Sequence, residues 1–384
     1  MLDLEALPVI DGHCHPFEEK HRQLTVRRLA GLLSMAPSER GGELAVWNFP
    51  VALMVGNLAA LLGCPNEPEA VVEARNARAA ELGTYVKDLF ADANIRCLLF
   101  DRGFPRARGP GVLLPDDTLP VALREICRAE ALFAGYEEGK DALIFPGAPN
   151  LDFAVFLQRF ESEIVSGVEG GRAVAIKTVM AYYTGLAVRP VPYDDAKRAY
   201  DACLAGDRSR EKEVRDYLFV LLAETAARLQ VPLQVHTGHT GVRRPWPEAN
   251  PILLQGVLAD ERCKKTTFVL LHAGYPFATE AGYLAAIFPN VYVDVSMMVP
   301  FASVGIEHRL VELMGIAPFE KVVYGSDGFG IPEINWLAAK LAKKALGTVL
   351  GRAVEQRVLG SDAAYRIADR IFWRSAEGLY GCRV

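Results

Sequence analysis

The sequence predicts an α/β chain folded as a (β/α)8 barrel, the TIM-barrel architecture. Short apolar runs rich in β-branched residues alternate with longer segments of helical periodicity. Eight such runs can be counted, and no glycine-rich nucleotide-binding motif opens a helix. A closed barrel holds eight parallel strands and tolerates long insertions, so we expect residues 1–384 to form one domain.

The expected strands are short, and most are apolar throughout. They lie at Pro8–His13, Ile95–Phe100, Ala142–Phe145, Ala173–Val179, Leu233–His236, Thr267–His272, Val291–Val295 and Val322–Tyr324, of which Ala142–Phe145 is the weakest. Between them, apolar residues recur at helical spacing in three longer segments, at Glu211–Leu229, Ala278–Ile287 and Pro332–Leu346.

Two segments exceed the minimal strand–helix repeat. Residues 17–92 lie between the first two expected strands and carry helical patterns at Thr25–Met35, Ala52–Leu62 and Pro68–Leu89, so we expect a helical cap inserted after strand one. Residues 187–210 lengthen the loop after the strand at Ala173–Val179. Loops at this end of a barrel build the active site, so both insertions are expected to shape the substrate pocket; the alternative is a packing role alone.

The composition excludes several classes of partner. The chain is 51% hydrophobic and carries a net charge of -5 with scattered basic residues, which argues against nucleic acid. No apolar run reaches the roughly 20 residues that cross a bilayer, and the N-terminal residues do not resemble a signal peptide. Seven cysteines without a CxxC pair argue against disulfides and cysteine-rich zinc sites. We therefore expect a cytoplasmic protein with a small-molecule substrate, and a homo-oligomer remains open.

The strongest local signal is an apolar strand that ends in two histidines, in the run VIDGHCHP. Alternate residues of a strand point to the same face, so His13 and His15 can converge on one ion while Cys14 points away. Taken alone, the pattern also fits two unrelated polar residues at the end of a strand.

Other polar residues follow expected strands in the same way. Four of the seven histidines close or follow an apolar run: His13, His15, His236 and His272. Asp327 repeats the arrangement at the last strand, with a helix N-cap as the alternative role. Barrel enzymes carry catalytic groups at these strand ends. His13, His15, His236 and Asp327 would suit Zn²⁺, which makes hydroxide available near neutral pH or polarises a carbonyl.

Six motifs together resemble the amidohydrolase superfamily, in particular the amidohydrolase-related subgroup of FluG-like N-terminal domains and non-oxidative decarboxylases. They are DGHCHPF, IKTVMAYYTGL, VHTGHTG, LLHAGYPF, VYVDVSM and VYGSDGFGIPE, within residues 8 to 335. The resemblance implies a distorted barrel whose site residues follow strands one, five, six and eight: His13 and His15, His236, His272, and Asp327. In the family, that aspartate touches the metal and accepts the proton of the attacking water.

The resemblance leaves the roles of several residues open. His272 is either a second ligand or an acid/base group that polarises the substrate, and we favour the second role. Lys177 stands where binuclear members carry a carbamylated lysine; it could also bind a substrate carboxylate as an ammonium or be a solvated rim charge. We predict one divalent ion, Zn²⁺ or another such as Mn²⁺, and an uncarbamylated Lys177. Tyr182 and Arg243 are candidate substrate contacts, and His239 is either a contact or a loop residue.

The predicted function is hydrolysis of an amide C–N bond or an ester bond in a small anionic substrate by metal-activated water. Asp327 would act as the general base and His272 as the second catalytic group. The alternative is a non-oxidative decarboxylase, in which His272 helps to protonate the carbon that loses CO2. A scaffold without catalysis is a third possibility. Neither the substrate nor the oligomeric state follows from the sequence.

Overall fold

Eight parallel strands form one sheet in the computed structural model, which describes residues 1–35, 39–104, 119–136, 141–171 and 173–382. Each strand is hydrogen-bonded to the next in the order β1-β2-β3-β4-β5-β6-β7-β9. Their bounds are β1 Val9–Cys14, β2 Ile95–Asp101, β3 Ala122–Arg128, β4 Ala173–Thr178, β5 Leu233–Val235, β6 Phe268–Leu270, β7 Val291–Asp294 and β9 Val322–Val323. The short β8 (Ser296–Met297) lies outside this order.

Hydrogen bonds between the first strand and the segment after the last strand close the sheet into a barrel. The Gly12 N–H donates to the Tyr324 carbonyl at 3.0 Å, and the Asp327 N–H donates to the His13 carbonyl at 2.9 Å. The predicted (β/α)8 barrel is therefore confirmed.

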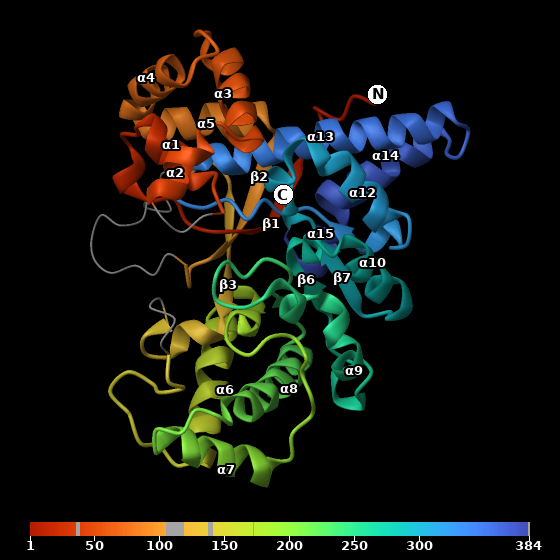
Figure 1. The fold of residues 1–384 in the computed structure, drawn as a ribbon. Coiled ribbons are helices and arrows are strands. Elements are labelled where there is room, and N and C mark those ends of the chain that lie inside the picture. The colour runs from red at the N-terminus through yellow and green to blue at the C-terminus, as the bar shows by residue number, and fades with distance from the viewer. Residues whose placement is uncertain (36–38, 105–118, 137–140, 172, 383–384) are drawn as a thin grey trace.

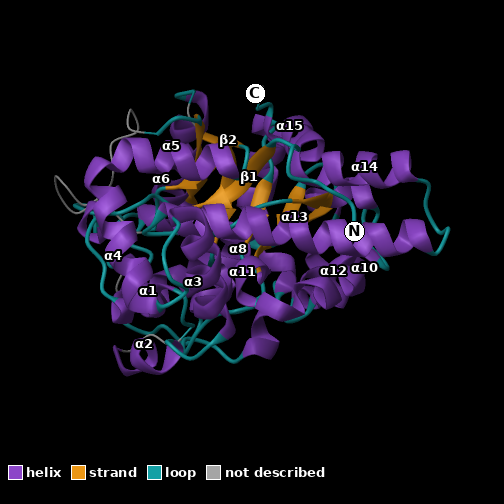
Figure 2. Ribbon diagram, turned by 90° about the horizontal axis from the view of Figure 1, so that it is seen from above, coloured by secondary structure: helices purple, strands orange, loops and turns teal. Residues whose placement is uncertain are grey.

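Helices surround the strands, which lie in the middle of the molecule in Figure 2. Their bounds are α1 Val26–Leu32, α2 Glu39–Ala45, α3 Phe49–Leu62, α4 Pro68–Arg78, α5 Leu82–Asp92, α6 Phe153–Glu169, α7 Tyr193–Leu204, α8 Glu211–Leu229, α9 Gln255–Leu258, α10 Ala278–Ile287, α11 Met298–Phe301, α12 Ile306–Met314, α13 Pro332–Glu355, α14 Ser361–Asp369 and α15 Ser375–Tyr380. None of the helices in the described ranges is long and apolar enough to span a membrane.

The third strand is not where the sequence analysis placed it. The expected strand at Ala142–Phe145 is wrong: Leu143 has a left-handed φ of 55°, and Phe145 forms only an isolated bridge to Ala148. The third strand is β3, whose first four residues, 122–125, are only partly covered by neighbouring atoms. Its sequence ALREICR carries three charged side chains, so it lacks the continuous apolar run typical of a buried parallel strand.

The helices expected in residues 17–92 are present as α1 to α5, between β1 and β2. Figure 1 shows them gathered at one end of the molecule, away from α6, α7 and α8 at the other. A buried ion pair ties this segment to the barrel, because Arg75 of α4 lies 2.5 Å from Glu333 of α13. Arg75 also donates to the carbonyls of His21 and Arg22. Residues 187–210 contain α7.

The core divides between the outside and the inside of the barrel. Two large apolar clusters lie between the strands and the surrounding helices. A smaller cluster, which includes Ile10, Cys97 and Ala175, fills part of the barrel interior and includes Ala376 and Tyr380 of α15. The C-terminal helix therefore packs against the strands that carry the polar residues described next.

Candidate metal centre and substrate pocket

Both histidines of the HxH motif are oriented by oxygen acceptors. His13 Nδ1 lies 2.9 Å from Gln234 Oε1, and His15 Nδ1 lies 3.1 Å from the Asp101 carbonyl. The Gln234 amide nitrogen donates to the Gly12 carbonyl at 2.9 Å, which turns its oxygen toward His13. Since these oxygens only accept, each Nδ1 carries the proton and each Nε2 presents a lone pair.

Asp327 faces these two lone pairs. Its Oδ1 lies 3.3 Å from His13 Nε2 and 3.2 Å from His15 Nε2, and no hydrogen-bond donor reaches it from the described residues. Burial, followed by the charge of Lys177, lowers the pKa of His13 to about 3, so a second proton on that ring does not explain the approach. Three electron-rich atoms that converge in this way fit a divalent cation such as Zn²⁺.

Asp101, at the end of β2, places a second carboxylate beside the histidines. Ligand atoms of His13, His15 and Asp101 all lie within 4.8 Å of one another. Asp101 Oδ2 accepts from Arg128 Nε at 2.7 Å and lies 3.2 Å from Lys177 Nζ. Burial opposes its ionisation, but the charges of Arg128 and Lys177 hold the pKa of Asp101 well below its usual value. The sequence analysis missed both Asp101 and Arg128.

Lys177 is buried between the histidine motif and Asp101. Its Nζ lies 2.7 Å from His13 Nε2, and its side chain is only 2% exposed. Burial lowers the pKa of Lys177 to about 8, and Arg128 acts in the same direction while Asp101 opposes it. Lys177 is therefore not a solvated rim charge.

His236 and His272 form a second pair beside the first. His236 Nδ1 lies 2.9 Å from His272 Nε2, and His236 Nε2 donates to the His239 carbonyl at 2.6 Å. His272 Nδ1 lies 2.9 Å from Ser296 Oγ, and the His272 and His13 rings are 5.8 Å apart between centroids. Both nitrogens of His236 thus have partners outside the His13–His15–Asp327 group. Its role as a metal ligand stays a prediction, because Nδ1 would have to exchange His272 for the ion.

Several residues at this site have a strained backbone. His272, Ala273, Met297 and Asp327 all adopt positive φ values, between 49° and 68°. Such conformations cost on the order of 1–3 kcal/mol for a residue with a side chain, and they cluster at functional sites. The strained residues follow β6, β7 and β9, which indicates that the ends of these strands serve a function in addition to packing.

A buried carboxylate under the site holds the loop that carries Asp327. Asp11 accepts from the Ser326 backbone N–H at 2.8 Å and from its hydroxyl at 2.5 Å. The Asn335 amide of α13 donates to the same carboxylate at 3.0 Å. Asp11 on β1 therefore fixes the loop after β9 next to the HxH motif.

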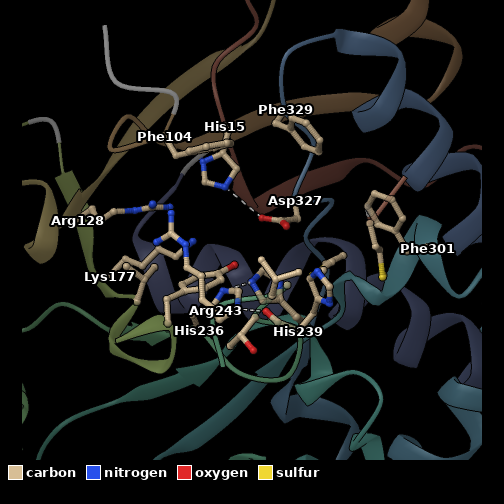
Figure 3. A pocket seen from close by; sticks show the side chains of 18 of the residues that line it. His15, Phe104, Arg128, Lys177, His236, His239, Arg243, Phe301, Asp327 and Phe329 are labelled. Carbon is tan, nitrogen blue, oxygen red and sulfur yellow. Dashed lines mark hydrogen bonds and ion pairs between the residues drawn. The ribbon is translucent and has the colours of Figure 1, made fainter. Parts of the chain in front are cut away.

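A cavity of about 370 Å³ opens above these groups (Figure 3). The predicted site residues other than His13 line it: His15, Lys177, Tyr182, His236, His239, Arg243, His272 and Asp327. The Tyr182 ring lies 4.4 Å from the His236 ring, and the Arg243 guanidinium lies 5.5 Å from the Tyr182 ring centroid. The residues predicted from the sequence therefore meet in one pocket.

Comparison with known proteins identifies the family. A family model described as amidohydrolase matches residues 10–381. The protein FluG of Emericella nidulans is 29% identical over an alignment of 239 residues, and the match covers 59% of this chain. The match covers only 27% of FluG, so the matched part of this chain spans about a quarter of that relative.

Solved structures share the barrel. A proposed metal-dependent hydrolase of Lactobacillus casei superposes with a TM-score of 0.84 and 24% identity over 100% of both chains. A glucuronate isomerase of Caulobacter crescentus superposes with a TM-score of 0.68 and 14% identity, over 99% of this chain and 93% of the isomerase. At these identities the likeness establishes the fold. Together with the family match over residues 10–381, the histidine and aspartate groups at the strand ends show that the chain belongs to the amidohydrolase family of enzymes.

Proposed function

We propose that the chain is a metal-dependent hydrolase that cleaves an amide C–N bond or an ester bond of a small anionic molecule. One observation carries the proposal: His13 Nε2, His15 Nε2 and the undonated Asp327 Oδ1 converge at 3.2–3.3 Å. A divalent ion would bind all three atoms, with the Lys177 ammonium, 2.7 Å from His13 Nε2, giving way to it. The family membership supports the same chemistry.

His13, His15 and Asp327 would hold one divalent ion, Zn²⁺ or an ion such as Mn²⁺, with His236 as a further ligand. When bound, such an ion lowers the pKa of water and polarises a substrate carbonyl. We propose one ion per chain and an uncarbamylated Lys177, because the Lys177 ammonium is paired with Asp101 at 3.2 Å. That pairing also balances the positive charge next to a bound cation.

The pocket residues would have different roles in hydrolysis. Asp327, at the boundary between the buried site and the cavity, would accept the proton of the attacking water. His272, hydrogen-bonded to His236, would polarise the scissile group. The substrate would contact four residues that line the cavity: Lys177, Tyr182, Arg243 and His239. The positive charges of Lys177 and Arg243 would favour an anionic substrate.

A non-oxidative decarboxylase is the second candidate. The observation that favours it is the position of Lys177, whose ammonium lies 2.7 Å from His13 Nε2. A substrate carboxylate bound by this ammonium would lie next to the proposed metal ligands.

The experiment measures both reactions on one preparation. Metal-free protein is reloaded with Zn²⁺ or Mn²⁺ and incubated with N-acyl amino acids, carboxylate-bearing esters and aromatic acids, while amine, alcohol and CO2 release are followed. We expect metal-dependent hydrolysis that is lost in His15→Ala and kept in His308→Ala, whose side chain is 74% exposed on α12. CO2 release without hydrolysis would instead support the decarboxylase. Absence of both reactions in the metal-loaded protein would refute both.

A further inference from the structure

One side of the cavity carries an excess of buried positive charge. Arg128, at the end of β3, is 8% exposed and lines the cavity beside Lys177. In the part of the chain that the structure describes, both side chains form ion pairs with Asp101 alone. Two cations therefore share one carboxylate, and an incoming anion would balance the charge.

Arg128 also has hydrogen-bonding capacity to spare. Its Nε and Nη2 donate to Asp101 Oδ2, and its Nη1 donates to the Tyr136 hydroxyl. A guanidinium has five N–H groups, so two of them lack an acceptor among the described residues. Figure 3 shows the Arg128 side chain reaching into the cavity. A planar guanidinium held rigidly by two partners is well suited to bind a carboxylate.

The far side of the cavity is apolar. Phe301 of α11 and Phe329, which follows Asp327 in the chain, line it. A third ring, Phe104, lies nearer the other side, beside His15, with its centroid 5.4 Å from the His15 ring and 6.4 Å from that of Phe329. Figure 3 places Arg128 at one side of the cavity and Phe301 at the other, with Asp327 between them.

We infer that the pocket takes a small amphipathic carboxylate, with the carboxylate bound by Arg128 and an aromatic or branched aliphatic group packed against Phe301 and Phe329. The inference rests on the proposed function only for the position of the scissile bond, which would lie between the two ends at Asp327. Amino acids that carry an aromatic N-acyl group have this arrangement. A cavity of about 370 Å³ accommodates a molecule of that size.

Binding of probes without a scissile bond tests the inference independently of catalysis. Zn²⁺-loaded protein is titrated calorimetrically with 4-phenylbutanoate, which has the length of N-benzoylglycine, with neutral 4-phenylbutanamide, and with butanoate. Because charge-assisted hydrogen bonds and ring burial each contribute, we expect 4-phenylbutanoate to bind at least about tenfold more tightly than either other probe.

Two variants test the charged end and the apolar end of the pocket separately. Arg128→Lys should weaken 4-phenylbutanoate about tenfold and leave 4-phenylbutanamide unchanged, which also reports that the pocket is intact. Arg124→Lys, on the same strand and outside the cavity lining, is the matched control. Phe301→Ala should weaken 4-phenylbutanoate but not butanoate.

Equal binding of the acid and the amide by the wild-type protein would overturn the inference. So would an unchanged affinity in Arg128→Lys, or no saturable binding of 4-phenylbutanoate up to about 10 mM. If 4-phenylbutanoate binds as expected but N-benzoylglycine and related amides and esters are not hydrolysed, the substrate class stands and the proposed hydrolysis fails.

Discussion

Replacing Gln234 should weaken metal binding although this side chain touches no ion. Gln234 is fully buried on β5, and its Oε1 accepts from His13 Nδ1 at 2.9 Å. Its amide nitrogen donates to the Gly12 carbonyl at 2.9 Å and to the Tyr380 hydroxyl at 3.0 Å. The glutamine therefore fixes the tautomer of His13 and leaves the Nε2 lone pair facing Lys177 and Asp327.

The structure separates two effects of Gln234→Leu. Loss of the acceptor for His13 Nδ1 frees the ring to rotate and to change tautomer, which typically lowers metal affinity 10- to 100-fold, or about 1.4–2.7 kcal/mol. The Gly12 carbonyl and the Tyr380 hydroxyl lose their donor, so we expect the free energy of unfolding to fall by about 1–3 kcal/mol for each group left unsatisfied.

Competition with a Zn²⁺ chelator measures the affinity, and urea unfolding of the metal-free protein measures the stability. Gln234→Glu keeps an acceptor for His13 but loses the donor to Gly12, so it should recover affinity relative to Gln234→Leu and remain destabilised. Tyr380→Phe keeps the Gln234–His13 bond and should bind Zn²⁺ like the wild type. An affinity of Gln234→Leu within about twofold of the wild type would refute the tautomer argument.

Four further outcomes follow from the site and the fold. His15→Ala should lower the Zn²⁺ content measured by elemental analysis while the circular dichroism spectrum is unchanged, because ligand loss is local to the end of β1. Asp327→Asn should lower kcat at least about 100-fold and reduce metal content much less, since an amide oxygen can bind the ion but cannot accept the proton; an unchanged kcat would make Asp327 purely structural. Elemental analysis and mass spectrometry should give one ion per chain and an unmodified Lys177, and two ions with a carbamate would contradict this. Arg75→Met leaves Glu333 as an unpaired buried carboxylate and should lower the free energy of unfolding by about 3–5 kcal/mol in urea titrations; a change below about 1 kcal/mol would show that the ion pair does not hold the helical segment.

The strands that the sequence predicts correctly are those whose residues are almost all buried. Phe268–Leu270 and Leu233–Val235 are fully covered, so their apolar runs are continuous and easy to recognise. β3 is half-covered, and Arg124, Glu125 and Arg128 interrupt its apolar residues, so the continuous apolar pattern of the other strands is absent. The apolar run at Ala142–Phe145 lies outside the sheet although Leu143 and Phe145 are buried. It was mistaken for a strand because an apolar run is expected in a buried loop as well as in a buried strand.

The same limits explain the residues of the site. His13, His15 and Asp327 were predictable because polar residues that follow an apolar strand are conspicuous. Asp101 satisfies the same criterion, since it ends the run IRCLLFD. Gln234 lies inside its strand and acts on His13 across 221 residues of sequence, so only the folded barrel reveals its role.

Asp101 connects the proposed metal site to the proposed anion site. Its backbone carbonyl fixes the tautomer of His15, while its side chain pairs with Arg128 and Lys177. Removing that side chain would leave both buried cations unpaired but would keep the carbonyl and hence the His15 tautomer. The effect of Asp101→Asn on metal binding would therefore arise through the charge next to His13, not through the orientation of His15. Asp101 would thus allow the proposed cation and the proposed anionic substrate to occupy adjacent parts of one pocket.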